Sequence, residues 1–273
     1  MTPTSLTIVL PAYNEEARLG GALDELFGYL HRHGDRARAG SPGPGALPDR
    51  VQVLVVDDGS TDGTAALVQA RPEAQERHGG PAQLSMLRVP HGGKGAAVRA
   101  GMLAAQADLV LFMDADMATP PDQIPLVVRA LQDHDVALGS RIQSDGSDMR
   151  ASQPLYRRAI GRVFRVLASL WVTGPVQDTQ CGFKGFRRSV AHDLFGRQRV
   201  TSIVFDVELI YLARRRGYGI AVVPIRWADR PGSHMHLRPV LALRVAWDLF
   251  RIPLIHRAVG RHAAAAPDGE RAA

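Results

Sequence analysis

The stretch VQVLVVDDGS, residues 51–60, decides the fold class of this chain. Its continuous apolar run is typical of a strand that is buried on both faces of a parallel sheet. The run ends on two adjacent carboxylates, Asp57 and Asp58, and the turn residues Gly59 and Ser60 follow them. The stretch therefore predicts a core strand whose carboxyl end carries polar chemistry.

Strand-like and helix-like segments alternate on both sides of this stretch. Helical spacing of apolar residues and helix-start signals predict helices near 15–32, 93–106, 120–133 and 205–217. This alternation predicts an α/β fold with a Rossmann-like, mostly parallel central sheet and helices on both faces. The other expected strands are LTIVLP (6–11), LSMLRV (84–89), DLVLFM (108–113), DVALGSR (135–141) and GIAVVPIRW (219–227).

Three polar segments follow expected strands: PAYNEE (11–16), DDGS (57–60) and DAD (114–116). Parallel sheets bind their ligands at the carboxyl ends of the strands, so we expect these segments to meet at one rim. Asp114 and Asp116 offer the hard oxygen ligands that Mg²⁺ or Mn²⁺ prefers, usually together with substrate phosphates. Such a pair can also be a simple turn or cap. The two other segments at the rim favour the metal interpretation.

Two glycine-containing segments keep more than one interpretation. In DDGS, a carboxylate can accept a hydrogen bond from a nucleobase or a ribose hydroxyl, or Asp58 or Ser60 can cap the following helix. HGGKG (91–95) resembles a phosphate-binding loop, but Gly95 follows Lys94 where a Walker A motif has Ser or Thr. A nucleotide triphosphatase is therefore disfavoured. PAYNEE contains no glycine, which disfavours a dinucleotide-binding fold as well.

Composition predicts a cytoplasmic protein with an anionic partner. The chain has 273 residues, 45% of them hydrophobic, which is enough for one large core. Cys181 is the single cysteine, so no intrachain disulfide can form, and we expect neither a signal peptide nor a bilayer-spanning helix. The net charge is +6. Only Lys94 and Lys184 among the 33 basic residues are lysines, which makes these two compact ammonium groups candidate functional residues.

The second half of the chain contains two basic, apolar segments. In PLYRRAIGRVFRVLASLW (154–171), helical spacing separates apolar residues such as Phe164 and Trp171 from a row of arginines. LRPVLALRVAWDLFRIPLIHR (237–257) has a similar composition. Such helices either lie in a membrane interface or pack on the sheet with a solvated basic face, and both interpretations stay open. The arginines of the first segment are Arg157, Arg158, Arg162 and Arg165.

Six ordered blocks of the sequence resemble the family 2 glycosyltransferases of GT-A fold. Within that family the chain is most similar to dolichyl-phosphate β-glucosyltransferases and bacterial polyprenyl-phosphate glycosyltransferases. The resemblance implies one GT-A domain over 1–262, with a nucleotide-sugar half at about 1–141, an acceptor half at about 142–262 and a disordered tail at 263–273. The blocks are TIVLPAYNEE, VLVVDDGSTDGT, GGKGAAVRAGM, VLFMDADMATP, DTQCGFKGFRR and FDVELIYLARRRGY.

The resemblance also implies roles for single residues. Asp206 and Glu208 belong to a family motif, but the resemblance assigns them no individual role. Asp116, Asp178, Gln180 and Lys184 would form the catalytic group, with Asp114 and Asp116 holding the donor ribose and Mg²⁺ or Mn²⁺. The donor would bind Pro11, Tyr13, Asn14 and Glu15 around uridine, Asp57 and Asp58 at the base, and Lys94 near the nucleotide. The acceptor would bind Asp178, Gln180 and Lys184, with Arg187 nearby.

The expected reaction is an inverting transfer of a hexose, expected to be glucose, from a UDP-sugar to a polyprenyl or dolichyl phosphate. The acceptor phosphate is already largely dianionic near neutrality, since its second pKa is about 6, and needs no strong base. The relatives' hydrophobic anchor or C-terminal spans are not found here. The two basic, apolar segments are therefore expected to dock the enzyme peripherally on the anionic cytoplasmic face of the membrane.

Three alternatives remain. Transfer to a soluble hydroxyl acceptor would need a base, for which Asp178 or Asp206 is a candidate. A metal-dependent phosphatase would use Asp114 as nucleophile and Asp116 as acid, but Ala118 stands where threonine or valine is usual. A basic nucleic-acid-binding protein would exploit the arginines and would leave DDGS and DAD unexplained. We expect no nucleic acid among the partners.

Overall fold

The structure is a computed structural model, and it describes most of the chain. The described residues are 4–38, 47–75, 80, 82–149, 164, 166, 168–174, 176, 178–230 and 239–261.

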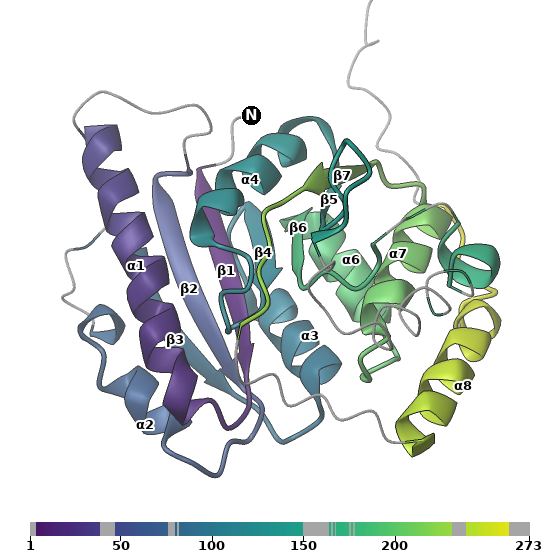
Figure 1. Cartoon of the computed structure of the whole chain (residues 1–273), viewed down its shortest axis with the longest axis horizontal. Coiled ribbons are helices and arrows are strands. Elements are labelled where there is room, and N and C mark those ends of the chain that lie inside the picture. The colour runs from purple at the N-terminus through teal and green to yellow at the C-terminus, as the bar shows by residue number, and fades with distance from the viewer. Residues whose placement is uncertain are drawn as a thin grey trace, which may run out of the picture.

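The described part of the chain folds around a seven-stranded sheet with the order β3-β2-β1-β4-β6-β5-β7 (Figure 1). The strands are β1 Ser5–Ala12, β2 Arg50–Asp57, β3 Ala82–Arg88, β4 Leu109–Met113, β5 Val136–Ser140, β6 Phe183–Arg187 and β7 Ile220–Pro224. The helices are α1 Glu16–Arg38, α2 Thr64–Gln69, α3 Lys94–Ala104, α4 Ile124–Asp133, α6 Arg188–Arg197, α7 Phe205–Arg216 and α8 Pro239–Ile255. Short helical turns are η1 Pro72–Ala74, η2 Pro121–Gln123 and η4 Ser169–Thr173.

The mostly parallel sheet is confirmed, with one exception that the sequence did not predict. β6 lies between β4 and β5 and runs antiparallel to both, with Met113 opposite Phe183 and Leu109 opposite Arg187. Lys184 interrupts the apolar run of this strand, so no strand pattern is visible there. The fifth strand along the chain is therefore not the spatial neighbour of the fourth.

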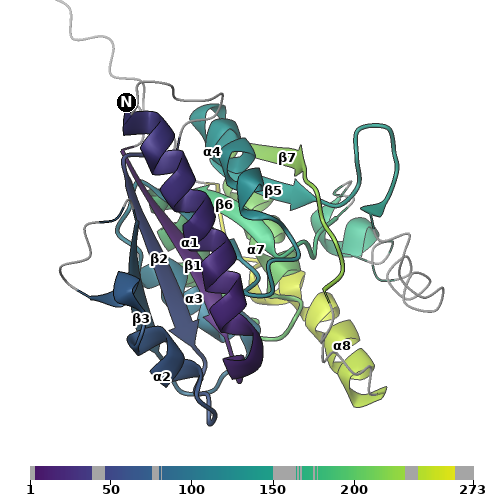
Figure 2. The same cartoon turned by 60° about the vertical axis from the view of Figure 1, so that its left-hand side comes forward.

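Both faces of the sheet are covered, as the apolar strands predict. On β1, Leu6, Ile8 and Leu10 pack into the core cluster with α1, α2 and α4, whereas Val9 packs into the cluster with α3, α6 and α7. Successive side chains of a strand point to opposite faces, so a strand buried on both sides reads as a continuous apolar run. In Figure 2, α1 crosses one face of the sheet and α8 lies far from the β3 edge.

A third, smaller cluster joins η4, α7 and α8. Val172 of η4, Val207 of α7 and the α8 residues Leu249 and Ile252 are buried in it. The segment expected as a helix at 154–171 lies mostly outside the described residues, and its end forms the π-helical turn η4. The expected tail at 263–273 also lies outside them. In the part of the chain that the structure describes, no helix is both long and apolar enough to cross a bilayer.

Candidate active site

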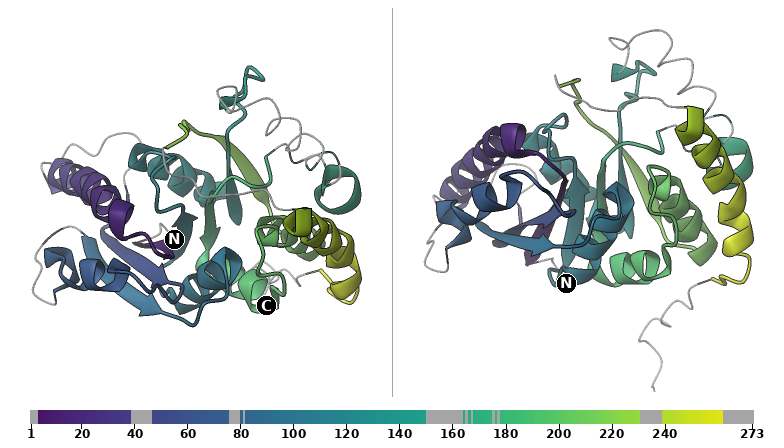
Figure 3. Two further views of the ribbon diagram at one scale, coloured as in Figure 1. Left: turned by 60° about the horizontal axis from the view of Figure 1, so that its bottom comes forward. Right: turned by 90° about the horizontal axis from the view of Figure 1, so that it is seen from below.

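The parallel strands end at one rim of the sheet, which Figure 3 (right) shows from below. The three polar segments meet there as predicted, because a chain of contacts links them. The backbone N–H of Asn14 donates to Ser60 Oγ at 3.0 Å. Asp58 accepts from Gly92 and Gly93, both at 2.9 Å. Lys94 completes this series of contacts with an ion pair to Asp114 at 2.5 Å. The antiparallel β6 begins at this rim, so the preceding turn, 178–182, joins it.

The turn after β1 presents one aromatic ring and one amide to the rim. Tyr13 is exposed and stacks on His91, with ring centroids 4.2 Å apart. Asn14 has φ +53°, and its side-chain carbonyl accepts from the Thr61 N–H at 2.9 Å. Pro11, the second-last residue of β1, is partly buried and lies opposite Val56. Tyr13 is therefore the residue of this turn that offers a flat surface to a ligand.

Glu15, the residue before α1, is held by an arginine from the first turn of that helix. Arg18 donates two hydrogen bonds to the Glu15 carboxylate, from Nε at 2.8 Å and from Nη2 at 2.7 Å. The positive charge of Arg18 also acts on Asp116, where it favours the ionised carboxylate. Arg18 thus pairs with Glu15 and adds positive charge that acts on Asp116.

The two aspartates after β2 have different roles. Asp57 is fully buried; its Oδ1 accepts from the Ser60 N–H at 2.9 Å, and its Oδ2 lies 3.1 Å from Arg88 Nε. Asp58 shapes the loop before α3, since it accepts from Gly92 and Gly93 and lies 2.9 Å from His91 Nδ1. Neither Asp58 nor Ser60 caps α2, so the capping interpretation is wrong.

Lys94, Asp114 and Asp116 form the charged centre of the rim. Burial lowers the pKa of Lys94, but the negative charges of Asp114 and Asp206 outweigh it and raise this pKa above its usual value. Burial and the Asp114 carboxylate raise the pKa of Asp116, although its Oδ1 accepts from the Ala118 N–H at 3.0 Å. The negative charges of Asp114 and Asp116 repel each other, so the centre favours a bound cation.

The residues Asp114 and Asp116 fit a divalent metal. Both offer hard oxygen ligands at the turn that follows β4, and a metal would offset the mutual repulsion of their negative charges. Among the described residues no three His, Cys, Asp or Glu side chains lie close enough to hold an ion by themselves. The remaining ligands would therefore come from donor phosphates and water.

The turn before β6 places Asp178 and Gln180 at the rim. Asp178 is buried, and Arg141 binds it in a two-pronged pair, with Nε at 2.8 Å and Nη2 at 2.7 Å. Burial lowers the pKa of Arg141, but the hydrogen bonds to Asp178 and its negative charge outweigh this effect, so the pKa of Arg141 lies above its usual value. Gln180 is partly buried. Asp178 is therefore held by a cation that stands at the end of β5.

Lys184 and Arg187 do not lie where an acceptor-binding role would place them. The side chain of Lys184 is fully buried, and its ammonium donates to Cys181 O at 2.5 Å and Asp206 Oδ1 at 2.6 Å. Arg187 lies at the other end of β6, where it donates to the carbonyls of His134 and Gln132. The antiparallel direction of β6 explains this, because it brings residue 183 to the rim and carries residue 187 away from it.

Glu208, the other motif residue without a role, lies in the interior. Its carboxylate accepts from the N–H groups of Arg199 and Val200, both at 2.9 Å, and lies 2.6 Å from His256 Nε2. It therefore fastens the segment before α7 to the end of α8. Sequence reasoning also assigned no role to His91, Arg18 and Arg141. Only His91 had a visible signal, its place in HGGKG.

Comparison with known proteins identifies a family and a fold. The family model described as "Glycosyl transferase family 2" matches residues 7–195. The dolichyl-phosphate beta-glucosyltransferase of Drosophila melanogaster is 36% identical over 90% of this chain and 74% of its own length. The human protein of the same name is 31% identical over 86% of this chain and 71% of its own length.

Solved structures give the same fold at lower identity. One is glucosyl-3-phosphoglycerate synthase from Mycobacterium tuberculosis in complex with UDP, with a TM-score of 0.58 at 19% identity, covering 96% of this chain and 82% of that one. The same enzyme with Mn²⁺, UDP-glucose and phosphoglyceric acid gives a TM-score of 0.57 at 20% identity, covering 95% and 82%. The GT-A-like architecture is thus shared.

Proposed function

The chain belongs to glycosyl transferase family 2 and is a glycosyltransferase, and from this premise we propose that it transfers glucose from UDP-glucose to a polyprenyl phosphate. Relatives named dolichyl-phosphate beta-glucosyltransferase cover most of this chain and support a lipid phosphate acceptor. A solved GT-A neighbour holds UDP-glucose and Mn²⁺, which supports the donor and a divalent metal.

The donor is assigned to the first half of the rim. We assign the uracil to the exposed ring of Tyr13, which offers a stacking surface, and to the buried carboxylate of Asp57, which would accept from a base N–H. Lys94 and Arg18 supply positive charge for the diphosphate. Asp114 and Asp116 would hold Mg²⁺ or Mn²⁺, which when bound would stabilise the charge on the departing UDP.

One observation carries the choice of a phosphate acceptor: both carboxylates that could serve as a base are held by cations. Asp178 is bound by Arg141, and Asp206 by Lys184. A hydroxyl acceptor needs a base, whereas a phosphate monoester is already ionised near neutrality. A phosphate oxygen would form the new bond to the anomeric carbon as the bond from that carbon to UDP breaks, which inverts the configuration.

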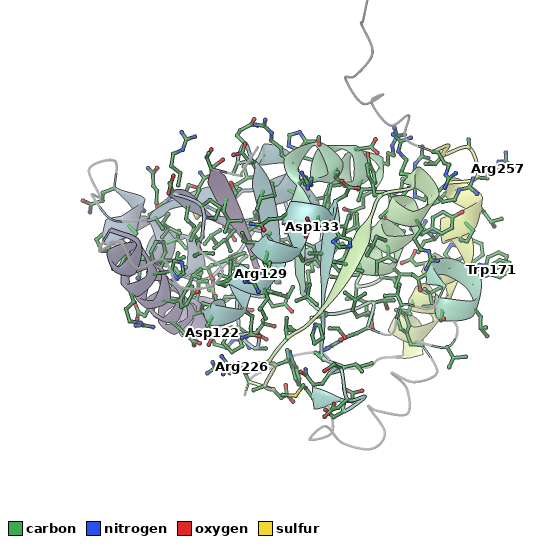
Figure 4. All side chains as sticks on the ribbon, turned by 90° about the horizontal axis from the view of Figure 1, so that it is seen from above. Asp122, Arg129, Asp133, Trp171, Arg226 and Arg257 are labelled. Carbon is green, nitrogen blue, oxygen red and sulfur yellow. The ribbon has the colours of Figure 1, made fainter. Side chains whose placement is uncertain are left out.

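We assign the membrane contact to an apolar edge made by η4 and α8. This apolar edge consists of Leu170, Trp171, Trp247, Phe250 and Leu254, all exposed. Trp171 stacks on Phe250 with ring centroids 6.0 Å apart, and Trp247 lies 6.0 Å from the same ring. Figure 4 shows Trp171 and the exposed Arg257 pointing outward on the same side of the molecule.

The composition of the apolar edge suits an anionic membrane surface. Aromatic side chains are favoured at the level of the lipid headgroups. Exposed arginines near an anionic leaflet contribute about 1 kcal/mol each, and Arg214, Arg215 and Arg257 lie on neighbouring elements. A polyprenyl tail stays in the bilayer, so the enzyme has to bring its rim to that surface. Peripheral docking on the cytoplasmic face would achieve this.

A radiolabelled-donor assay tests the proposed reaction. The purified protein is incubated with radiolabelled UDP-glucose, Mn²⁺ and polyprenyl phosphate in detergent or vesicles, and the organic phase is counted. We expect a lipid-soluble product whose glucose is released by β-glucosidase, since inversion of an α-linked donor gives a β-linkage. Asp116→Ala is the matched inactive control. If no UDP-hexose gives a lipid-soluble product, the lipid acceptor is wrong, and label on a soluble hydroxyl acceptor would favour the alternative.

A further inference from the structure

We infer that Lys184 is a positioning residue for the donor site, acting from the core through Asp206 and the turn 178–182. The inference rests on the proposed donor site, and it assigns Lys184 a place beneath the rim instead of contact with the acceptor.

The burial of Lys184 requires an explanation. Its side chain has no exposed surface, and its ammonium lies 5.5 Å from the centroid of the Phe112 ring in the middle of the sheet. A buried ammonium is expensive unless it is paired and hydrogen-bonded. Such pairs are often no more stabilising than apolar residues of the same volume. Stability alone therefore gives little reason to build a lysine into this strand, least of all in a chain that otherwise uses arginine.

The first connection from Lys184 to the donor site runs through Asp206. Asp206 is buried at the start of α7 and pairs with Lys184 at 2.6 Å. Burial raises the pKa of Asp206, while the charges of Lys184 and Lys94 both act to lower it. Asp206 therefore acts electrostatically on both lysines of the chain, and Gly95, which follows Lys94, packs against Phe205, which precedes Asp206. The Asp206 carboxylate attracts both Lys184 and Lys94. Its close pair with Lys184 weakens its attraction for Lys94.

The second connection runs through the turn. Lys184 donates to the carbonyl of Cys181, the residue next to Gly182. The Gly182 carbonyl accepts from the Asp114 N–H at 3.1 Å. A Cβ at Gly182 would overlap the carboxylate of Asp114, so the backbone of this turn packs directly against that carboxylate. Lys184 thus fixes the turn that packs against Asp114, while Asp206 attracts Lys94, which pairs with Asp114.

The consequence is a specific rearrangement when Lys184 loses its charge. In Lys184→Met, the buried Asp206 carboxylate keeps Lys94 as its nearest remaining partner. Lys94 is then drawn inward, away from Asp114 and from the position proposed for the donor diphosphate. We expect UDP to bind about tenfold more weakly in the presence of Mn²⁺, equivalent to ~1.4 kcal/mol. The lipid acceptor should saturate the variant at the same concentration as the parent.

The presence of only two lysines allows a direct test of this rearrangement. With Lys184 buried, Lys94 is the lysine whose amine a reagent can reach, and mass spectrometry follows its acetylation without any activity assay. We expect Lys94 in Lys184→Met to be acetylated several-fold more slowly than in the parent, since the ammonium moves toward the core. A purely structural role for Lys184 would leave this rate unchanged.

A matched control and a double variant separate positioning from stability. Arg216→Met removes the partner of Asp193, a partly buried pair on α6 and α7, and should lower Tm without changing UDP binding or Lys94 acetylation. Lys184→Met/Asp206→Asn removes both charges and should recover most of the lost Tm. Lys94 is no longer drawn inward in this double variant, so its acetylation rate should return to the parental value. UDP binding should stay weaker than in the parent, because the hydrogen bond from Lys184 that anchors the turn is still missing.

Each outcome decides a different point. If Lys184→Met lowers Tm but keeps the parent's UDP affinity and acetylation rate, Lys184 is structural and the inference is overturned. If Lys184→Met does not fold, the double variant decides alone, and recovery of parental UDP affinity overturns the inference. If the parent itself binds no UDP, the proposed donor site fails, whereas a changed acetylation rate would still establish the link between Lys184 and Lys94.

Discussion

Asp116 is a residue whose charge opposes folding. Burial and the neighbouring Asp114 raise the pKa of its carboxyl, so the native state binds a proton more readily than the unfolded chain. Stability then falls as pH rises through this pKa, and at neutral pH the charge has a cost. The metal-binding role that we propose for Asp116 would account for this cost, since active sites commonly trade stability for function.

Asp116→Asn should therefore abolish transfer without lowering stability. The amide oxygen can still accept from the Ala118 N–H, while the repulsion from Asp114 is removed. At pH 7.5 we expect the Tm of the variant to equal or exceed that of the parent, measured by calorimetry in metal-free buffer. Toward pH 4 the difference should shrink as the parent's carboxyl takes up a proton. A Tm several degrees below the parent at pH 7.5 would contradict this assignment.

Gly182 is a residue whose missing side chain matters. Gly182→Ala should displace the Asp114 carboxylate, because the new Cβ would overlap it. We expect kcat to fall at least about tenfold, or ~1.4 kcal/mol in the barrier, and metal-dependent donor binding to weaken. The control is Gly196→Ala on α6, where a Cβ meets nothing. Alanine in a helix is favoured over glycine by about 0.5–1 kcal/mol, so that variant should be active and slightly more stable. Full activity in Gly182→Ala would refute the close packing.

At the scale of elements, α8 is an amphipathic helix with a fixed inner face. Leu249 and Ile252 pack toward α7, Asp248 accepts from Ser202 Oγ at 2.6 Å, and His256 pairs with Glu208. Trp247, Phe250 and Leu254 recur on the outer face at spacings of three and four residues. The inner contacts hold the helix, which leaves the outer side chains available for a membrane.

Replacing both Trp247 and Phe250 with serine should weaken vesicle binding several-fold and leave UDP binding unchanged. The loss reflects apolar burial in the lipid interface, which salt does not screen, so it should persist at high ionic strength. Sedimentation with anionic vesicles, at low and high salt, measures it. Leu126→Ser on α4 removes another exposed apolar side chain, distant in the fold, and is the control. Co-sedimentation of the double variant at the parent's level would show that α8 does not dock.

At the scale of the whole molecule, the rim joins segments that are distant in the sequence, so a ligand there should stabilise the entire fold. A ligand that binds only the native state adds RT ln(1 + [L]/Kd), about 2.7 kcal/mol at one hundred times Kd. UDP-glucose with Mn²⁺ should raise Tm by several degrees, and chelation should remove most of this shift. GDP-mannose is the matched control donor. An equal shift with and without metal would argue against the metal role of Asp114 and Asp116.

The sequence by itself determined every strand except β6, the mostly parallel sheet and the rim. A strand buried on both faces needs a continuous apolar run, and the polar residues that end such a run must lie at its carboxyl end. The sequence alone therefore predicts that PAYNEE, DDGS and DAD lie at one rim. The lysine bias also singles out Lys94 and Lys184 as unusual residues, although it does not separate their roles.

Only the tertiary structure decided which charged side chains form ion pairs with one another. Arg141 and Asp178 are 37 residues apart, and Lys184 and Asp206 are 22 apart, so no local spacing encodes either pair. β6 gives no apolar run because Lys184 and Gly185 interrupt it, and its antiparallel direction moves Arg187 to the far end of the sheet. Periodicity records whether a side chain is buried, whereas its partner depends on how distant segments pack. That packing buries Lys184 completely and leaves the side chain of Lys94 partly exposed at the rim.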